Sequence, residues 1–260
     1  MQPATGMQSG IPSVNAAAGT SEIFLRFDVL EFIQKEKERK PSMTNQESKE
    51  FIGQAVQKLK ERGWIAEGDL TPSSITEEEL EAFEKKHQIT LPSLYKAFLT
   101  SYCFPDRDIE LFSIAYHLDE ISPLWLLLWS YRSIEELEGQ IEVLREIQDF
   151  CELPENSFQY LVPIGDWGAG WGPLCLDLSR PEEEVEEENE QTWALVWFDH
   201  EEFDWDKIYL GKDGLLHGSP AAPNLKTLLE WYFCGSLEAE FAKEEGVTPT
   251  YEWYQAGAEY

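Results

Sequence analysis

The spacing of apolar residues changes along this chain, and that change restricts the possible folds more than any other feature. Between residues 44 and 100 the apolar residues recur at three- and four-residue steps, as they do on one face of a helix. Beyond residue 157 they gather in short runs separated by turn residues, which is typical of strands. A group of helices followed by closely connected strands predicts an α+β fold with a mainly antiparallel sheet.

Polar caps mark the starts of the expected helices, because a Ser, Thr or Asn side chain can accept a hydrogen bond from a free amide of the first turn. The caps, with the glutamates that complete a capping box, are Thr44 with Glu47, Thr76 with Glu79, Ser133 with Glu136, and Asn224. Pro92 fits the first position of a further helix, because its ring holds φ near the helical value and it has no N–H. The expected strands cover residues 110–118, 158–164, 174–178, 193–199 and 205–210.

Composition divides the chain into four parts. Residues 1–20 are rich in Gly, Ala, Ser and Pro without periodicity, which predicts a flexible tail. Residues 21–63 predict an N-terminal helical extension, although 21–34 fit a strand as well as a helix. Residues 64–235 carry the main α+β domain. Residues 236–260 are acidic and aromatic, and we expect this C-terminal extension to wrap the surface.

The net charge indicates which classes of partner the protein can attract. Fifty acidic residues face 20 basic ones, for a formal charge of −30. Such a surface repels nucleic acid and anionic membranes, and it attracts basic partners. Simple solubility is the alternative explanation, because acidic surfaces also keep proteins dispersed. The four cysteines are far apart without a CxxC pair, and the N-terminus lacks the basic and apolar regions of a signal peptide. We therefore expect free thiols and a cytoplasmic location.

A glycine-rich stretch, residues 165–172, could be taken for a phosphate-binding loop. A phosphate loop requires a helix directly after the glycines, whereas Pro173 and an expected strand follow here. A β-hairpin connection is the better interpretation. Trp167 and Trp171 are then expected to be exposed on it and to contact a partner, because aromatic residues are enriched in interfaces.

Two acidic segments are candidate binding elements. The first collects five carboxylates around His200, namely Asp199, Glu201, Glu202, Asp204 and Asp206. A metal or general-base site is conceivable there, but no second ligand cluster accompanies it, so we interpret it as a solvated turn that can meet a basic partner. The second, residues 182–190, has seven Glu in nine positions, including Glu183 and Glu187. We expect this loop to be mobile and either a solubilising loop or an element that steers a cationic protein.

No residue pattern predicts catalysis. The four histidines are scattered, and no Ser or Cys lies in a known nucleophile context. We therefore predict no catalytic residues, no metal and no cofactor. A hydrolase stays open as an alternative, because catalytic triads are assembled in space.

Four segments, in this order, resemble the SUKH superfamily, the Smi/Knr-type proteins. They are ITEEELEAFEKKHQITLPSLYKAFLTSY (75–102), FQYLVPIGDWGAGWGPLCLDLS (158–179), TWALVWFDHE (192–201) and NLKTLLEWYFCG (224–235), so the likeness covers roughly residues 64–235. Residues 103–107 depart from the glycine-containing turn usual in that superfamily. The helix 133–150, the glutamate loop and both terminal extensions look like additions.

The resemblance implies one twisted sheet flanked by helices and a function in protein binding. Bacterial members of the superfamily typically act as immunity proteins that neutralise toxins, often nucleases or deaminases, and fungal relatives regulate cell-wall synthesis through protein contacts. Neither function needs an active site. We expect a non-catalytic module that binds a basic protein, foremost a toxin domain that targets nucleic acid. A regulatory scaffold and an uncharacterised hydrolase are the alternatives.

Overall fold

The computed structural model describes residues 43–62, 70–103, 109–117, 120–167, 172–180, 192–202 and 204–236, with only the backbone described for 109–117 and 120–127. All of these residues belong to one compact unit, residues 41–260. The expected tail (1–20), residues 21–42 of the N-terminal extension and residues 237–260 of the C-terminal extension lie outside the described residues.

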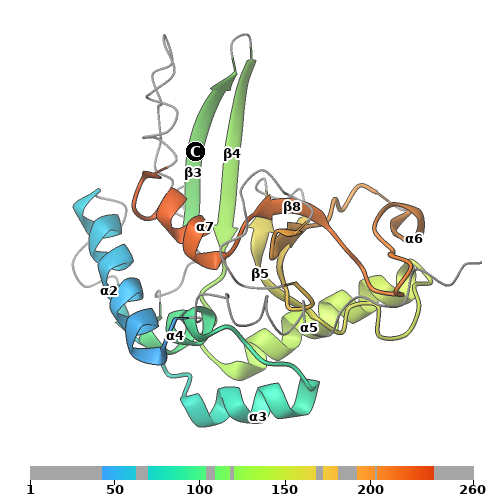
Figure 1. Ribbon diagram of the computed structural model, residues 1–260, viewed down its shortest axis with the longest axis horizontal. Coiled ribbons are helices and arrows are strands. Elements are labelled where there is room, and N and C mark those ends of the chain that lie inside the picture. Colours follow the sequence, from blue (N-terminus) through green and yellow to red (C-terminus); the bar gives the residue numbers. More distant parts are fainter. Residues whose placement is uncertain are drawn as a thin grey trace, which may run out of the picture. The chain divides into compact units, whose positions relative to one another are not determined.

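The predicted helices form, and most of their caps are confirmed (Figure 1). They are α2 (Asn45–Glu61), α3 (Glu77–His87), α4 (Ser93–Ser101), α5 (Ile134–Phe150) and α7 (Leu225–Tyr232). The capping boxes of Thr44 and Thr76 are both complete, and the Asn224 side chain accepts from the amide of Thr227.

Two helix starts differ from the prediction. Pro92 is the N-cap of α4 and not its first helical residue. Ser133 is the N-cap of α5, but its side chain makes no capping hydrogen bond. The Glu136 carboxylate instead accepts from the amide of Arg132 at 2.7 Å, one residue before the cap. The expected capping box at Ser133 is therefore wrong, because the glutamate is already engaged by the preceding residue.

The described strands confirm the α+β class and the antiparallel sheet. Six strands run in sequence order across it, and each pairs antiparallel with its neighbours. They are β3 (Ile109–His117), β4 (Glu120–Leu128), β5 (Leu161–Trp167), β6 (Gly172–Asp177), β7 (Leu195–Trp197) and β8 (Ser219–Ala222). In addition, β1 (Thr71–Pro72) pairs with β2 (Tyr102–Cys103), a small second sheet that the prediction of a single sheet did not include.

One predicted strand is a helix. Residues 205–210 contain α6 (Trp205–Ile208), whose amides at Lys207 and Ile208 donate to the Asp204 carbonyl. Trp205 and Tyr209, four residues apart, are both buried, while the three residues between them are exposed. A spacing of four residues between buried side chains is typical of a helix. The predicted strand at residues 205–210 is therefore wrong, because its apolar residues follow the helical spacing.

Alternate residues of the sheet face two different cores. Leu174 and Leu176 of β6 belong to a core shared with α2, α3, α4 and α7, whereas Cys175 between them belongs to a core shared with α6 and the C-terminal half of α5. Successive side chains of a strand point to opposite faces, so both faces of this sheet are covered. α2 contributes Ile52 and Leu59 to the first core, so it packs as part of the same unit.

Tyr95 of α4 gives a test of this core. Its side chain is buried, its hydroxyl has no hydrogen-bond partner among the described residues, and burial raises its pKa far above the usual range. An unsatisfied buried hydroxyl costs about 1–3 kcal/mol. Tyr95→Phe is therefore expected to increase the free energy of unfolding by about 1 kcal/mol, measured by urea denaturation. Tyr131→Phe is the control, because the Tyr131 hydroxyl donates to the Pro163 carbonyl at 3.0 Å and its loss should destabilise. A destabilised Tyr95→Phe variant would contradict the prediction.

Candidate protein-binding surface

The five carboxylates predicted at residues 199–206 lie between the end of β7 and the first turn of α6. We call Asp199, Glu201, Glu202, Asp204 and Asp206 the acidic turn. Asp199 is half-buried and the other four are exposed. The basic residue nearest in sequence, Lys207, forms an exposed ion pair with Asp204 at 2.6 Å. The turn therefore presents a surplus of negative charge to solvent.

Hydrogen bonds fix the start of the acidic turn to the core. The amide of Asp199 donates to the Tyr209 hydroxyl at 3.1 Å, and the Trp205 indole N–H donates to the Asp199 carbonyl at 3.1 Å. The Asp199 carboxylate accepts from the amide of Glu201 at 2.9 Å. These hydrogen bonds attach Asp199, at the start of the turn, to Trp205 and Tyr209 after it.

Below the turn lies a cluster of four buried aromatic rings. Trp205 stacks on Phe198 with centroids 5.1 Å apart and meets Tyr209 edge-on at 5.6 Å. Phe158 packs against both Phe198 and Trp205. Aromatic pairs in such geometries add stability beyond the area they bury. The acidic turn therefore lies next to a closely packed cluster of aromatic side chains.

The other predicted contact residues are not at this surface. Trp167 is the last residue of β5 and only 6% exposed, within the core shared with α2 and α4, so its expected exposure is wrong. The strand ends three residues later than predicted, and the register shift between Pro163 and Gly165 puts Trp167 on the same core face of β5 as Val162 and Ile164. Trp171, Glu183 and Glu187 lie outside the described residues.

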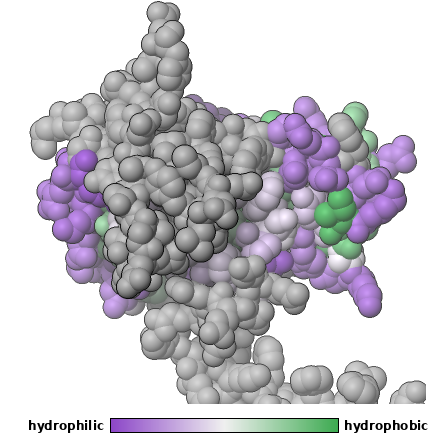
Figure 2. All heavy atoms as spheres, turned by 90° about the horizontal axis from the view of Figure 1, so that it is seen from above, coloured by the Kyte–Doolittle hydropathy of each residue, from purple (hydrophilic) through white to green (hydrophobic). Residues whose placement is uncertain are grey.

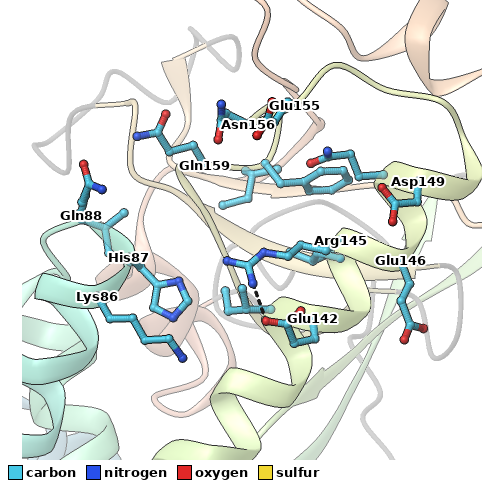
Figure 3. Close-up of a pocket in the computed structure, with 16 residues that line it drawn as sticks. Lys86, His87, Gln88, Glu142, Arg145, Glu146, Asp149, Glu155, Asn156 and Gln159 are labelled. Atoms are coloured by element: carbon cyan, nitrogen blue, oxygen red, sulfur yellow. Dashed lines mark hydrogen bonds and ion pairs between the residues drawn. The ribbon is translucent and has the colours of Figure 1, made fainter.

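Sequence reasoning missed a cleft of about 580 Å³ between the end of α3, α5 and the segment after α5. Figure 3 shows Lys86 and His87 on the α3 side and Arg145 facing them from α5, with its guanidinium directed into the space and paired with Glu142. Gln159 lines it from the third side. The sequence feature that could have indicated this cleft is Arg145, which is the single basic residue of the acidic helix α5.

A charged group ties the two helices of this cleft together. Glu138 of α5 accepts from Lys86 at 2.6 Å and lies 3.0 Å from the His87 ring nitrogen. Burial alone would raise the pKa of Glu138, but the hydrogen bonds and charges of Lys86 and His87 outweigh it and lower the pKa. The cations of this cleft are thus engaged within the protein.

Neither the acidic turn nor the cleft offers a metal site. Among the residues that the structure describes, no group of three or more His, Cys, Asp or Glu side chains could hold a metal ion. None of the described helices is long and apolar enough to cross a membrane.

Comparison with known proteins identifies the family. Residues 74–230, more than half of the chain, match the SMI1/KNR4 family (SUKH-1). The chain belongs to the SMI1/KNR4 family. No curated protein and no solved structure matches it. The matched region begins just before α3 and ends within α7, and it includes the acidic turn. α2 lies before the SMI1/KNR4 match, although it packs into the same core.

Within the SMI1/KNR4 region, Arg180 links the two sides of the glutamate loop, because it pairs with the buried Asp177 before the loop and donates a hydrogen bond to Trp193 after it. Asp177, whose side chain is 1% exposed, lies with one carboxylate oxygen 2.9 Å from Arg180 Nε. Arg180 also donates to the carbonyl of Trp193 at 2.7 Å. His217 Nδ1 lies 3.6 Å from the same Asp177 oxygen. Described residues on the two sides of the glutamate loop are therefore in direct contact through Arg180.

Proposed function

We propose that this SMI1/KNR4 family protein is a non-catalytic protein-binding module, and that it acts as an immunity protein that neutralises a basic toxin domain. The acidic turn carries the proposal. Its four exposed carboxylates lie close together in the chain, beside a buried aromatic cluster to which Asp199 is hydrogen-bonded. A segment that is already attached to the core loses less conformational entropy when a partner binds.

The overall charge supports a basic partner. At −30, the protein attracts cations over its whole surface, and complementary fields raise the rate of encounter. Toxins that act on nucleic acid carry basic surfaces for the phosphate backbone. An acidic protein that covers such a surface would block access of the nucleic acid.

The direct test uses the protein encoded by the neighbouring gene. Stoichiometric inhibition of its toxic activity by the purified chain is the expected result. Binding without inhibition of any toxic activity would instead favour a regulatory scaffold. Absence of binding to the neighbouring protein would contradict the proposed function.

The acidic turn should control the rate of association. We expect that neutralising it by Glu201→Gln, Glu202→Gln, Asp204→Asn and Asp206→Asn slows association about tenfold at low salt and flattens its salt dependence. Charges at the edge of an interface act mainly on encounter, and salt screens them beyond about 8 Å at physiological ionic strength. Stopped-flow binding at low and high salt measures both effects.

A matched variant separates the location of the charge from its amount. Glu50→Gln, Glu61→Gln, Glu78→Gln and Glu81→Gln remove four exposed charges from α2 and α3. This control should change association much less than the variant of the acidic turn. Equal slowing by both sets would mean that only net charge matters.

A further inference from the structure

Among the described residues, three large apolar side chains are strongly exposed: Val143 (45%), Phe150 (75%) and Ile208 (51%). Val143 and Phe150 are seven residues apart on α5 and so share one face. The opposite face of α5 is the one buried in the core, through Leu137, Ile141 and Leu144. α5 therefore has two exposed apolar side chains, Val143 and Phe150, on the face turned away from the core, with the exposed Glu146 between them.

The C-terminal end of this face of α5, which carries Phe150, lies next to the acidic turn. Ile147 and Cys151, on either side of Phe150, pack against the cluster that contains Trp205. Burial raises the pKa of the Cys151 thiol, and the nearby charge of Asp206 raises it further. Figure 1 places α6 beside the C-terminal end of α5, and Figure 2 shows green apolar surface bordered by purple hydrophilic surface at that end of the view.

The charged residues in the last turn of α5 and directly after it are acidic. α5 carries six acidic residues and one base, Arg145, which pairs with Glu142. Its last turn contains Asp149 and no basic residue, and Glu152 follows. The C-terminal end of a helix is the negative end of its dipole, where cations are stabilising and anions are not. This end of α5 thus combines an exposed aromatic ring with a negative field that no residue of its last turn compensates.

The charge also limits what can cover this surface. A second copy of the chain carries the same −30, and residues 237–260 have six acids against one Lys. Both would bring like charge against Asp149 and Glu146. We infer that the outer face and C-terminal end of α5 are a docking surface for a basic amphipathic helix of a partner protein, with Phe150 as its apolar anchor. This inference rests on the proposed function only for the class of partner.

The test uses a synthetic helical peptide with Leu on one face and Lys and Arg on the other. Fluorescence anisotropy at low salt should show binding to the full-length protein. Phe150→Ala should weaken it about tenfold or more, because a central aromatic anchor carries much of the energy of an interface. Asp149→Asn should weaken binding less and reduce its salt dependence. Because Phe150 is exposed, the fold should persist, which circular dichroism can verify. Glu78→Gln with Glu81→Gln on α3 is the control and should leave the affinity unchanged.

Three outcomes would overturn the inference. The first is an unchanged affinity of Phe150→Ala for the peptide. The second is equal binding of a peptide in which Glu replaces Lys and Arg. The third is self-association that Phe150→Ala abolishes, since the occupant would then be a second copy. None of these decides the toxin-inhibition test, so failure of the docking surface and failure of the proposed function are distinguishable.

Discussion

Trp205→Ala is expected to lower the free energy of unfolding by about 3–5 kcal/mol, the usual range when a buried Trp or Phe is replaced by Ala. The Trp205 ring is buried against Phe198, Tyr209 and Phe158, and its indole N–H holds the Asp199 carbonyl. The substitution opens a cavity under the acidic turn and releases the backbone that the turn depends on. The proposed function therefore predicts that Trp205→Ala also slows association with the basic partner.

Urea denaturation followed by circular dichroism measures this loss, since removal of a Trp changes the fluorescence signal. Trp205→Phe is the matched control. It keeps an aromatic ring in the cluster and removes the hydrogen bond to Asp199, so a loss of about 1–2 kcal/mol is expected. If Trp205→Ala cost less than Trp205→Phe, the aromatic cluster would not be the base of the acidic turn.

Breaking the pair of Asp177 and Arg180 is expected to have an effect of similar size. Removing one partner of a buried ion pair typically costs about 3–5 kcal/mol, because the other charge is left buried and unpaired. Asp177→Leu leaves Arg180, whose side chain is 12% exposed, without its carboxylate. Arg180→Leu leaves the buried carboxylate with the Ser179 amide and hydroxyl and the more distant His217, and it also removes the hydrogen bond to the Trp193 carbonyl.

A double-mutant cycle tests this pair. The combined Asp177→Leu and Arg180→Leu variant should be much less destabilised than the sum of the two single variants, because neither charge is then left alone. The exposed pair of Lys49 and Glu77, at 2.6 Å, is the control, and its disruption should change stability little, since solvent screens surface pairs. Additive effects at Asp177 and Arg180 would contradict the predicted coupling.

The predictions that succeeded depend on residues close together in the chain. The capping box of Thr76 involves only residues 76–79, and the same holds for Thr44 and for Asn224 with Thr227. Such hydrogen bonds form between neighbours whatever the rest of the chain does. The grouping of the five carboxylates at the acidic turn was also predictable, because eight consecutive residues contain all of them.

The failed predictions at Ser133 and Pro92 concern neighbouring residues, whereas the other failures depend on contacts across the fold. Trp167 belongs to a glycine-rich stretch that predicts an exposed hairpin connection. It is nevertheless buried, because β5 is covered by helices from other parts of the chain. Residues 205–210 read as a strand, but Trp205 and Tyr209 pack on Phe198 only if the segment is helical.

The sequence alone therefore determined the α+β class, the caps of α2, α3 and α7 and the acidic character of the surface, because these follow from local hydrogen bonding, apolar periodicity and a count of charges. Only the tertiary structure decided that Asp177 and Arg180 anchor the segment of the glutamate loop at Trp193, and that α3 and α5 enclose a cleft. It also decided that Trp167 is buried and that residues 205–208 are helical. Both outcomes depend on packing between segments that lie far apart in the chain.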